Sequence, residues 1–253
     1  MRFLFITHYD ITVWRFKIPL LKRIIELGNV VYVACPTGRV SAKFEDLGIH
    51  HIPLKLTRNN RNPFNELQYI FELKNILKSI NPDIVQTYTI RPNLYGSWAN
   101  IIGRCKTPVV NSIMGLGTLY CDALESLKLK HYLMNLVYKV TFRNSKKVIF
   151  LNRDDLALFL NHNLIKQEQA ALIRGEGVDL SKFFPTENKQ MNKLKLGYDP
   201  ESVLILMVAR LIREKGIKEF AEAAAVLSNK FSDKVCFLVI GDFDPGKSIL
   251  FVK

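Results

Sequence analysis

The sequence predicts an α/β protein with a doubly wound parallel sheet, followed by the beginning of a second sheet of the same kind. Apolar runs of strand length alternate with stretches of helix length about six times before residue 175. The alternation stops in a polar stretch, 185–200, and restarts with the apolar run 203–208. Since strands buried on both faces read as continuous apolar runs, 203–208 predicts a fully buried parallel strand.

Turn residues bound the apolar runs of the first half. These runs predict strands at 2–8, 29–35, 50–56, 83–89, 108–114, 147–151 and 171–174. The stretches between them predict helices at 16–27, 40–47, 64–79, 93–103, 124–142 and 154–160. Glycine follows two of these helices, at Gly28 and Gly48, where it can adopt the left-handed conformation that ends a helix. Residues 9–15 read as a loop, and Pro19 falls in the first turn of the next helix, where proline is tolerated.

The second half repeats the pattern only briefly. After the strand at 203–208 we expect a short turn, a helix that carries Lys215 and Gly216 and runs on over 217–230, and a strand at 235–240. The expected domains are therefore 1–185 and 186–253. Two strands in about 65 residues are too few for a closed α/β domain. Either something else completes this sheet or the chain is a fragment.

Composition excludes several classes of protein. The chain has 253 residues, of which 48% are apolar, and its longest apolar runs are strand length, so none predicts a transmembrane helix. Met1 and Arg2 lead directly into a strand without the apolar core of a signal peptide. The four cysteines form no CxxC pair, so we expect reduced thiols in a cytosolic protein, with neither a disulfide framework nor a zinc site.

The chain is strongly basic, with a net charge of +13, and most of the excess lies in residues 1–185. Such a surface suits an anionic partner: phospholipid headgroups, a phosphorylated substrate or nucleic acid. No homeodomain, zinc-finger, RRM or KH pattern is present, which argues against nucleic acid. The alternative is a basic surface that only maintains solubility.

Arg210 and Lys215 stand out at the carboxyl end of the strand 203–208 and the start of the following helix. In open α/β sheets, ligands bind at this edge. Helix N-termini also present unpaired N–H groups and a partial positive charge, which suit phosphate. The two cations could therefore clamp a pyrophosphate. A solvated basic turn is the alternative.

Four stretches, taken together, resemble segments of one family, although each stretch alone is weak evidence. They are DIVQTYTIRPNLYGSWAN (83–100), NSIMGLG (111–117), GEGVDLSKFFP (175–185) and VARLIREKGIKEFAEAA (208–224). They are similar to segments of the retaining glycosyltransferases of family 4, whose GT-B architecture consists of two facing Rossmann-like domains. The resemblance extends over residues 1 to about 242. It is greatest to the bacterial branch that extends polyprenyl-diphosphate-linked or lipopolysaccharide glycans.

The resemblance implies a GT-B type fold: an N-terminal Rossmann-like parallel sheet with helices on both faces and an incomplete second Rossmann-like domain. The first half would bind a lipid-linked or lipopolysaccharide acceptor and the membrane, and the second half a nucleotide-sugar. The donor diphosphate would contact Arg210 and Lys215, with Gly241 and Asp242 in a donor-side loop. The acceptor side would include Asp10, Arg15, Gly115 and Gly117, and the domain junction Gly175, Gly177, Val178 and Asp179. Neither a cofactor nor a metal is implied, and no protein nucleophile is assigned.

Two departures from the family pattern bear on activity. Met114 occupies a position where many members have histidine, which we interpret as a feature of the subfamily. The acidic E-x7-E segment that holds the donor sugar and ribose has no counterpart. We therefore expect a hexosyltransferase that is weak or inactive as this truncated chain. The alternative is a non-catalytic remnant, or half of a split enzyme, that serves as an acceptor-binding or scaffold domain.

Two other features receive a structural interpretation. Residues 241–248 fit the Walker A pattern, but a P-loop needs a helix after its lysine, and five residues after Ser248 are too few. Asp242 and Asp244 would also repel phosphate. His8 ends the first strand and could face the cleft expected between the domains, although a lone histidine is more often structural.

Residues 127–147 are the candidate membrane surface. An apolar stripe at helical spacing comprises Leu129, Tyr132, Leu133, Leu136, Val137 and Val140. Basic residues flank it at Lys128, Lys130, Lys139, Arg143, Lys146 and Lys147. Such a helix could lie on anionic lipid at the cytoplasmic face of the plasma membrane. The alternative, which we favour, is that the stripe packs on the sheet while the basic flank touches lipid by charge alone.

Overall fold

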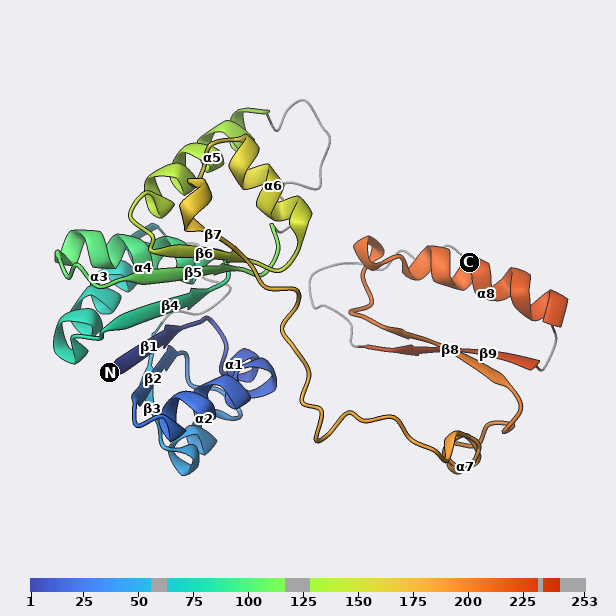
Figure 1. Ribbon diagram of the computed structural model, residues 1–253. Helices are drawn as coiled ribbons and strands as arrows, with labels where there is room; N and C mark the ends of the chain where they lie inside the picture. The colour runs from blue at the N-terminus through green and yellow to red at the C-terminus, as the bar shows by residue number, and fades with distance from the viewer. Residues whose placement is uncertain (56–62, 117–127, 232–233, 242–253) are drawn as a thin grey trace. The chain divides into compact units, whose positions relative to one another are not determined.

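The computed structural model describes residues 1–55, 63–116, 128–231 and 234–241. It divides the chain into two compact units, Met1–Leu180 and Ser181–Lys253 (Figure 1). The sheet of the first unit has the strand order β3-β2-β1-β4-β5-β6-β7, and every pair in it is parallel. Its strands are β1 (Arg2–Ile6), β2 (Val30–Cys35), β3 (Ile49–Pro53), β4 (Ile84–Tyr88), β5 (Val109–Ile113), β6 (Lys147–Phe150) and β7 (Ala170–Leu172). The predicted doubly wound parallel sheet is therefore confirmed.

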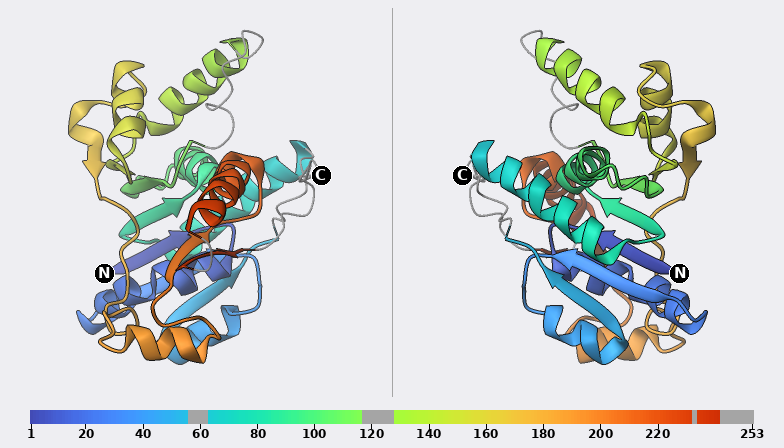
Figure 2. Two further views of the ribbon diagram at one scale, coloured as in Figure 1. Left: turned by 90° about the vertical axis from the view of Figure 1, so that its right-hand side faces the viewer. Right: turned by 90° about the vertical axis from the view of Figure 1, so that its left-hand side faces the viewer.

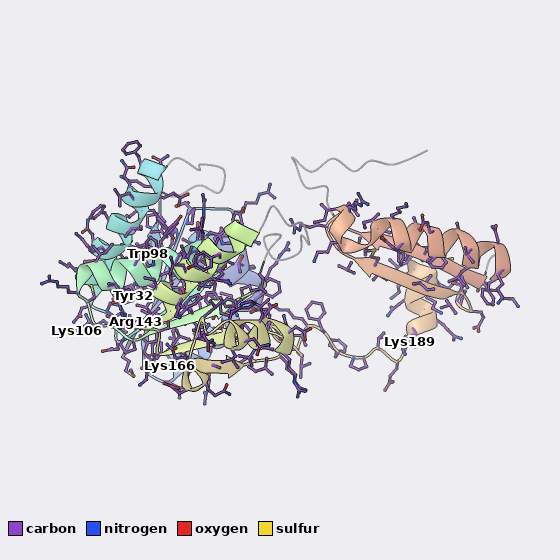
Figure 3. The ribbon with its side chains drawn as sticks, turned by 90° about the horizontal axis from the view of Figure 1, so that it is seen from above. Tyr32, Trp98, Lys106, Arg143, Lys166 and Lys189 are labelled. Carbon is purple, nitrogen blue, oxygen red and sulfur yellow. The ribbon has the colours of Figure 1, made fainter. Side chains whose placement is uncertain are left out.

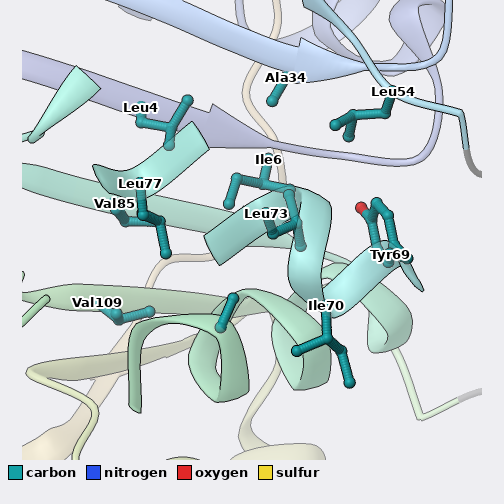
Figure 4. Close-up of a cluster of buried hydrophobic side chains, with 11 residues drawn as sticks. Leu4, Ile6, Ala34, Leu54, Tyr69, Ile70, Leu73, Leu77, Val85 and Val109 are labelled. Atoms are coloured by element: carbon teal, nitrogen blue, oxygen red, sulfur yellow. The ribbon is translucent and has the colours of Figure 1, made fainter. Parts of the chain in front are cut away.

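Helices cover both faces of this sheet (Figure 1, Figure 2). They are α1 (Asp10–Phe16), α2 (Ile18–Glu26), α3 (Pro63–Ile80), α4 (Ile90–Gly103), α5 (Lys128–Phe142) and α6 (Arg153–Asn161), with 3₁₀ turns η1 (Ser41–Leu47) and η4 (Gln167–Gln169). Because successive side chains of a strand point to opposite faces, Leu4 and Ile6 face α3 and α4 (Figure 4). Phe5 faces α1 and α2 on the other side of the sheet. A third apolar cluster lies where α5 and α6 meet β5 and β6.

One predicted loop is wrong. Residues 9–15 belong mostly to α1, and the single helix expected over 16–27 is two helices that meet at Lys17. Pro19 explains the break, because its ring would clash with the carbonyl of Arg15 in a continuous helix and it has no N–H to donate. The consequence is a bend that brings Lys17 to the carboxyl edge of the sheet.

A buried polar network joins the centre of the first unit. Asn111 of β5 donates from Nδ2 to Thr87 Oγ1 at 2.8 Å and to Ser97 Oγ at 3.0 Å. Ser145 Oγ donates to Asn111 Oδ1 at 2.6 Å, and Thr87 Oγ1 donates to Asn93 Oδ1 at 2.6 Å. All five side chains are buried. Since these polar groups pair with one another, the network fixes β4, α4, β5 and the turn before β6 relative to each other.

The second unit contains α7 (Lys189–Lys195), β8 (Val203–Val208), the 3₁₀ turn η5 (Arg213–Lys215), α8 (Ile217–Phe231) and β9 (Val235–Ile240). The strands β8 and β9 pair in parallel, as expected. The prediction that β8 is fully buried is wrong. Exposed apolar side chains of the two strands are Val203, Leu206, Val208, Val239 and Ile240. Helix α8 packs on β9 through Phe220 and Phe237, whose rings lie 5.7 Å apart.

Candidate active site at the carboxyl edges of the two sheets

The carboxyl edge of the first sheet has a topological switch point between β1 and β4. From β1 the chain proceeds through β2 to β3 in one direction, and from β4 it proceeds to β7 in the other. The loops that follow β1 and β4 therefore diverge to opposite faces of the sheet. In open α/β sheets this is where ligands bind.

His8 and Thr89 flank the switch point. The Nδ1 atom of His8 and the Oγ1 atom of Thr89 lie 2.7 Å apart, within hydrogen-bonding distance. Thr89 precedes α4 with a φ of 72°, a left-handed conformation that is strained for a β-branched residue. Strained residues of this kind concentrate at functional sites. The sequence left both a structural and a functional role open for His8. It gave no sign of Thr89, because the signal of Thr89 is a backbone angle.

Lys17, Tyr88 and Glu176 form a second cluster at the same edge. Lys17 Nζ pairs with a carboxylate oxygen of Glu176 and lies 4.5 Å from the centroid of the Tyr88 ring. Burial raises the pKa of the Tyr88 hydroxyl well above its ordinary value, and the nearby Glu176 carboxylate raises it further. The motif GEGVD drew attention to the glycines beside Glu176, and the sequence offered no reason to connect Glu176 with Lys17.

The expected acceptor-side residues occupy different environments. Asp10 is buried and accepts hydrogen bonds from the backbone N–H groups of Val40 at 2.8 Å and Ser41 at 3.0 Å. Through these two hydrogen bonds Asp10 holds the loop after β2 in place. Arg15 is exposed in the last turn of α1. Gly115 has a φ of 132°, which L side chains rarely adopt, with open space where a Cβ would lie. Gly117 lies outside the described residues.

The junction residues leave β7 through two left-handed glycines. Gly175 has a φ of 74° and Gly177 a φ of 79°. Val178 is 60% exposed. The side chain of Asp179 has at least one interaction partner. These residues precede the boundary between the two units at Leu180.

The carboxyl edge of the second sheet brings together three of the expected donor-side residues. Arg210 follows β8 and is exposed, and Lys215 is exposed at the end of η5. The expectation that Lys215 lies in the helix is wrong: Gly216 adopts a φ of 78°, and α8 begins only at Ile217. The 3₁₀ turn still ends directly before the N-terminus of α8, so both cations lie at the end of the sheet where a helix begins.

Gly241 follows β9 and contacts the same turn. A Cβ at Gly241 would lie 1.7 Å from the carbonyl oxygen of Ala209, the residue before Arg210. Ala209 also donates its N–H to Ile240 O at 3.1 Å. Only glycine allows this close approach, which fixes the backbone at Arg210 against the end of β9. Asp242, the other expected residue of this loop, lies outside the described residues.

Metal and thiol chemistry have little support in the described part of the chain. In residues 1–55, 63–116, 128–231 and 234–241, no group of three or more His, Cys, Asp and Glu side chains could hold a metal ion. Cys35, Cys105 and Cys236 are free thiols. Burial is the main cause that raises the pKa of Cys35 to about 12, so this thiol stays protonated at neutral pH.

The outer side of α5 is an exposed apolar surface. The expectation that its stripe packs on the sheet is wrong for four members, since Tyr138 and Phe142 occupy the buried side instead. The exposed members, which we call the α5 stripe, are Tyr132, Leu133, Leu136 and Val140. Val137 is half-buried, and the side chain of Leu129 lies outside the described residues.

Basic residues lie at and after the C-terminal end of α5. Lys139 is exposed in the last turn of the helix, and Lys146 and Lys147 are exposed beyond it. Arg143, which Figure 3 labels, is exposed directly after the helix. The described part of α5 contains no acidic residue. The Trp98 indole donates to Thr141 Oγ1 at 2.9 Å, which holds the opposite side of α5 against α4. Among the described residues no helix is both long and apolar enough to cross a membrane.

One family model matches more than half of the chain. Residues 7–152 match the family described as glycosyl transferase 4-like. The chain is 30% identical over 256 residues to N,N'-diacetylbacillosaminyl-diphospho-undecaprenol alpha-1,3-N-acetylgalactosaminyltransferase of Campylobacter jejuni, and the match covers 98% of the chain and 65% of that relative. The chain therefore spans slightly less than two thirds of the relative's length.

Solved structures share the fold. A glycosyltransferase from Rickettsia africae superposes with a TM-score of 0.68 at 21% identity, covering 95% of this chain and 60% of that one. HepE of Anabaena, solved with UDP and glucose, gives a TM-score of 0.68 at 16% identity, covering 97% and 62%. At these identities the likeness establishes the architecture alone.

Proposed function

The chain belongs to the glycosyl transferase 4-like family, and from that premise we propose that it transfers a sugar from a nucleotide-sugar to a lipid-linked or lipopolysaccharide glycan. The Campylobacter relative supports the acceptor class, because its name specifies a glycan on undecaprenyl diphosphate. The HepE structure, which contains UDP and glucose, supports a nucleotide-sugar as donor. The donor sugar, its nucleotide and the linkage formed are left open.

The arrangement of Arg210, Lys215 and Gly241 carries the proposal. When the bond between sugar and diphosphate breaks, negative charge accumulates on the leaving nucleoside diphosphate. Fixed cations at that position stabilise the charge in the transition state. Gly241 would act indirectly, because its lack of a side chain lets the end of β9 pack against Ala209 and so fixes the backbone that carries Arg210. We assign no protein nucleophile.

The acceptor would bind at the carboxyl edge of the first sheet, around the switch point. His8 and Thr89 offer an imidazole and a hydroxyl for hydrogen bonds to sugar hydroxyl groups. Gly115 would allow the acceptor to approach the backbone after β5. Arg15 is an exposed cation on α1 that could pair with an acceptor diphosphate. Asp10 would act indirectly, through the loop that it anchors.

A transfer assay tests the function. The chain is incubated with vesicles that contain a polyprenyl-diphosphate-linked oligosaccharide and, in turn, with UDP-, GDP- and dTDP-sugars. We expect the lipid-linked glycan to gain one sugar with one class of donor. Mass spectrometry of the extracted lipid measures the product, and a heat-inactivated sample is the control. Failure to bind any nucleotide and to extend any acceptor would contradict the proposal.

A second role is favoured by one observation, the exposed apolar side chains of β8 and β9. Parallel sheets normally have both faces covered. On this reading the chain is a non-catalytic acceptor-binding domain, or half of a split enzyme whose nucleotide-binding half is completed by another polypeptide. Binding of the lipid-linked oligosaccharide without sugar transfer to it would favour this role over the first.

The α5 stripe would dock the protein on anionic lipid at the cytoplasmic face of the plasma membrane. Its apolar side chains suit the boundary between headgroups and acyl chains, and the cations at and after the C-terminal end of α5 suit anionic headgroups. We expect Leu136→Glu to weaken binding to anionic vesicles about tenfold, because it removes an apolar contact and adds a repelling charge. Flotation of vesicles with and without phosphatidylglycerol measures the binding.

Leu20→Glu is the matched control for this prediction. Leu20 is 44% exposed on α2, on the opposite face of the sheet, whereas Leu136 is 51% exposed. Binding that is lost equally in both variants, or in neither, would contradict a docking surface on α5.

A further inference from the structure

Glu176 is directed into the first unit by the two glycines that flank it. Gly175 and Gly177 have φ angles of 74° and 79°, a region that residues with a side chain rarely adopt. The chain therefore turns sharply on both sides of Glu176. The side chain of Glu176 is only 14% exposed, although the segment around it leads out of the first unit.

Its partner, Lys17, comes from a distant part of the chain. Lys17 lies at the break between α1 and α2, 159 residues away from Glu176 in sequence, and its side chain is 13% exposed. The ammonium group also lies 4.5 Å from the centroid of the Tyr88 ring, a cation–π geometry. Three stretches thus meet at one point: the α1–α2 break, the end of β4 and the junction segment.

This contact is incompletely satisfied. Within the described residues, Oε1 of Glu176 and the hydroxyl of Tyr88 are buried without a hydrogen-bond partner. A buried carboxylate needs several hydrogen bonds to offset the loss of water, and a single ammonium partner supplies few of them. The ion pair is therefore held with little net stabilisation. Such an ion pair can break and form again, whereas an ion pair whose atoms all had hydrogen-bond partners would stay formed.

We propose that the Lys17–Glu176 pair is a reversible latch that positions the junction segment, residues 175–179, on the first unit. The latch fixes where the chain leaves that unit before Ser181, and its release gives the second unit more freedom. The inference rests on the proposed function insofar as sugar transfer needs groups from both units. Lys17 and Glu176 are positioning residues in this account and do not contact the substrate.

Segment-resolved amide hydrogen exchange tests the latch without relying on activity. The reporter is the amide of Ile173, which donates to Phe150 O at 2.9 Å two residues before Gly175. In Glu176→Gln we expect exchange of this amide to become about tenfold faster, because the charge that attracts Lys17 is gone and the end of β7 is less restrained. Lys17→Met should have the same effect, since it keeps the length of the side chain but removes its charge. The double variant Lys17→Glu with Glu176→Lys restores the attraction and should bring the exchange rate back towards that of the unmodified chain.

Glu168→Gln is the matched control. Glu168 pairs with Lys166 at 3.7 Å, but both side chains are more than 70% exposed, at 72% and 74%. Its removal should leave exchange of the Ile173 amide unchanged. Tyr88→Phe keeps the ring that faces Lys17 and removes the unpaired hydroxyl, so it should not accelerate exchange, whereas Tyr88→Leu should.

The transfer assay gives a second readout. If transfer depends on the position of the junction segment, Glu176→Gln should lower kcat about tenfold and leave the Kd for UDP unchanged. An exchange rate of the Ile173 amide that is the same in Glu176→Gln and Glu168→Gln would overturn the latch, whatever the activity. Faster exchange together with an absence of any transfer by the unmodified chain would support the latch and contradict the proposed function.

Discussion

Replacing Arg210 by alanine is expected to weaken UDP binding about 30-fold and to lower the transfer rate about 100-fold. The guanidinium can donate two hydrogen bonds to a diphosphate in a fixed planar geometry. Alanine leaves the negative charge of the diphosphate without this partner. The loss in rate should exceed the loss in binding, because negative charge grows on the leaving group as the bond to the sugar breaks. Isothermal titration with UDP and the transfer assay measure the two effects.

The control is Arg213→Ala. Arg213 is also exposed, lies three residues further along in η5, and carries the same charge. A general effect of positive charge would weaken binding equally in both variants and would contradict a specific contact at Arg210. We expect Arg213→Ala to change the Kd for UDP less than about threefold, since a solvated surface charge contributes little.

The second large effect is expected at Asn111, in the centre of the buried polar network. Asn111→Leu should lower the free energy of unfolding of the first unit by about 3 kcal/mol. Leucine has a similar volume but cannot pair with the buried hydroxyl groups of Thr87, Ser97 and Ser145. Each hydroxyl would then be buried with one hydrogen bond fewer. A buried polar group that lacks a partner costs more free energy than the loss of the hydrogen bond itself.

Urea unfolding followed by tryptophan fluorescence measures this change. Both tryptophans, Trp14 and Trp98, lie in the first unit, so the signal reports on that unit alone. Asn144→Leu is the control, because Asn144 is exposed next to Ser145 and its replacement should change stability by less than about 0.5 kcal/mol. Equal stability of the two variants would mean that the network contributes nothing beyond packing.

Most of the fold could be predicted from the sequence because its strands are continuous apolar runs. The strands expected at 203–208 and 235–240 match β8 and β9 to the residue. Gly48 ends η1 with a φ of 72°, as its position after the helix predicted. The break at Lys17 was missed because a proline early in a helical pattern is compatible both with a first turn and with a division into two helices.

The candidate site could be predicted only where a local motif marked it. Arg210 and Gly241 belong to segments whose residue types are informative in themselves, and the sheet brings them together as the parallel arrangement requires. Lys17 and Glu176 are 159 residues apart in the sequence, and only the tertiary structure brings them together. No local sequence pattern predicts such a contact. The exposure of Leu136 was misjudged for a related reason: α5 is apolar on two sides, and periodicity alone does not say which side meets the sheet.

The uncovered strands of the second unit have a practical consequence for preparing the protein. In residues 181–231 and 234–241, β8 and β9 pair only with each other, so each has one backbone edge without a neighbouring strand. Such edges, together with exposed valine and isoleucine side chains, can add strands from other molecules. Concentrated preparations of this chain should therefore self-associate, and a solubilising lysine in place of Val208, which is 70% exposed, is expected to reduce that tendency.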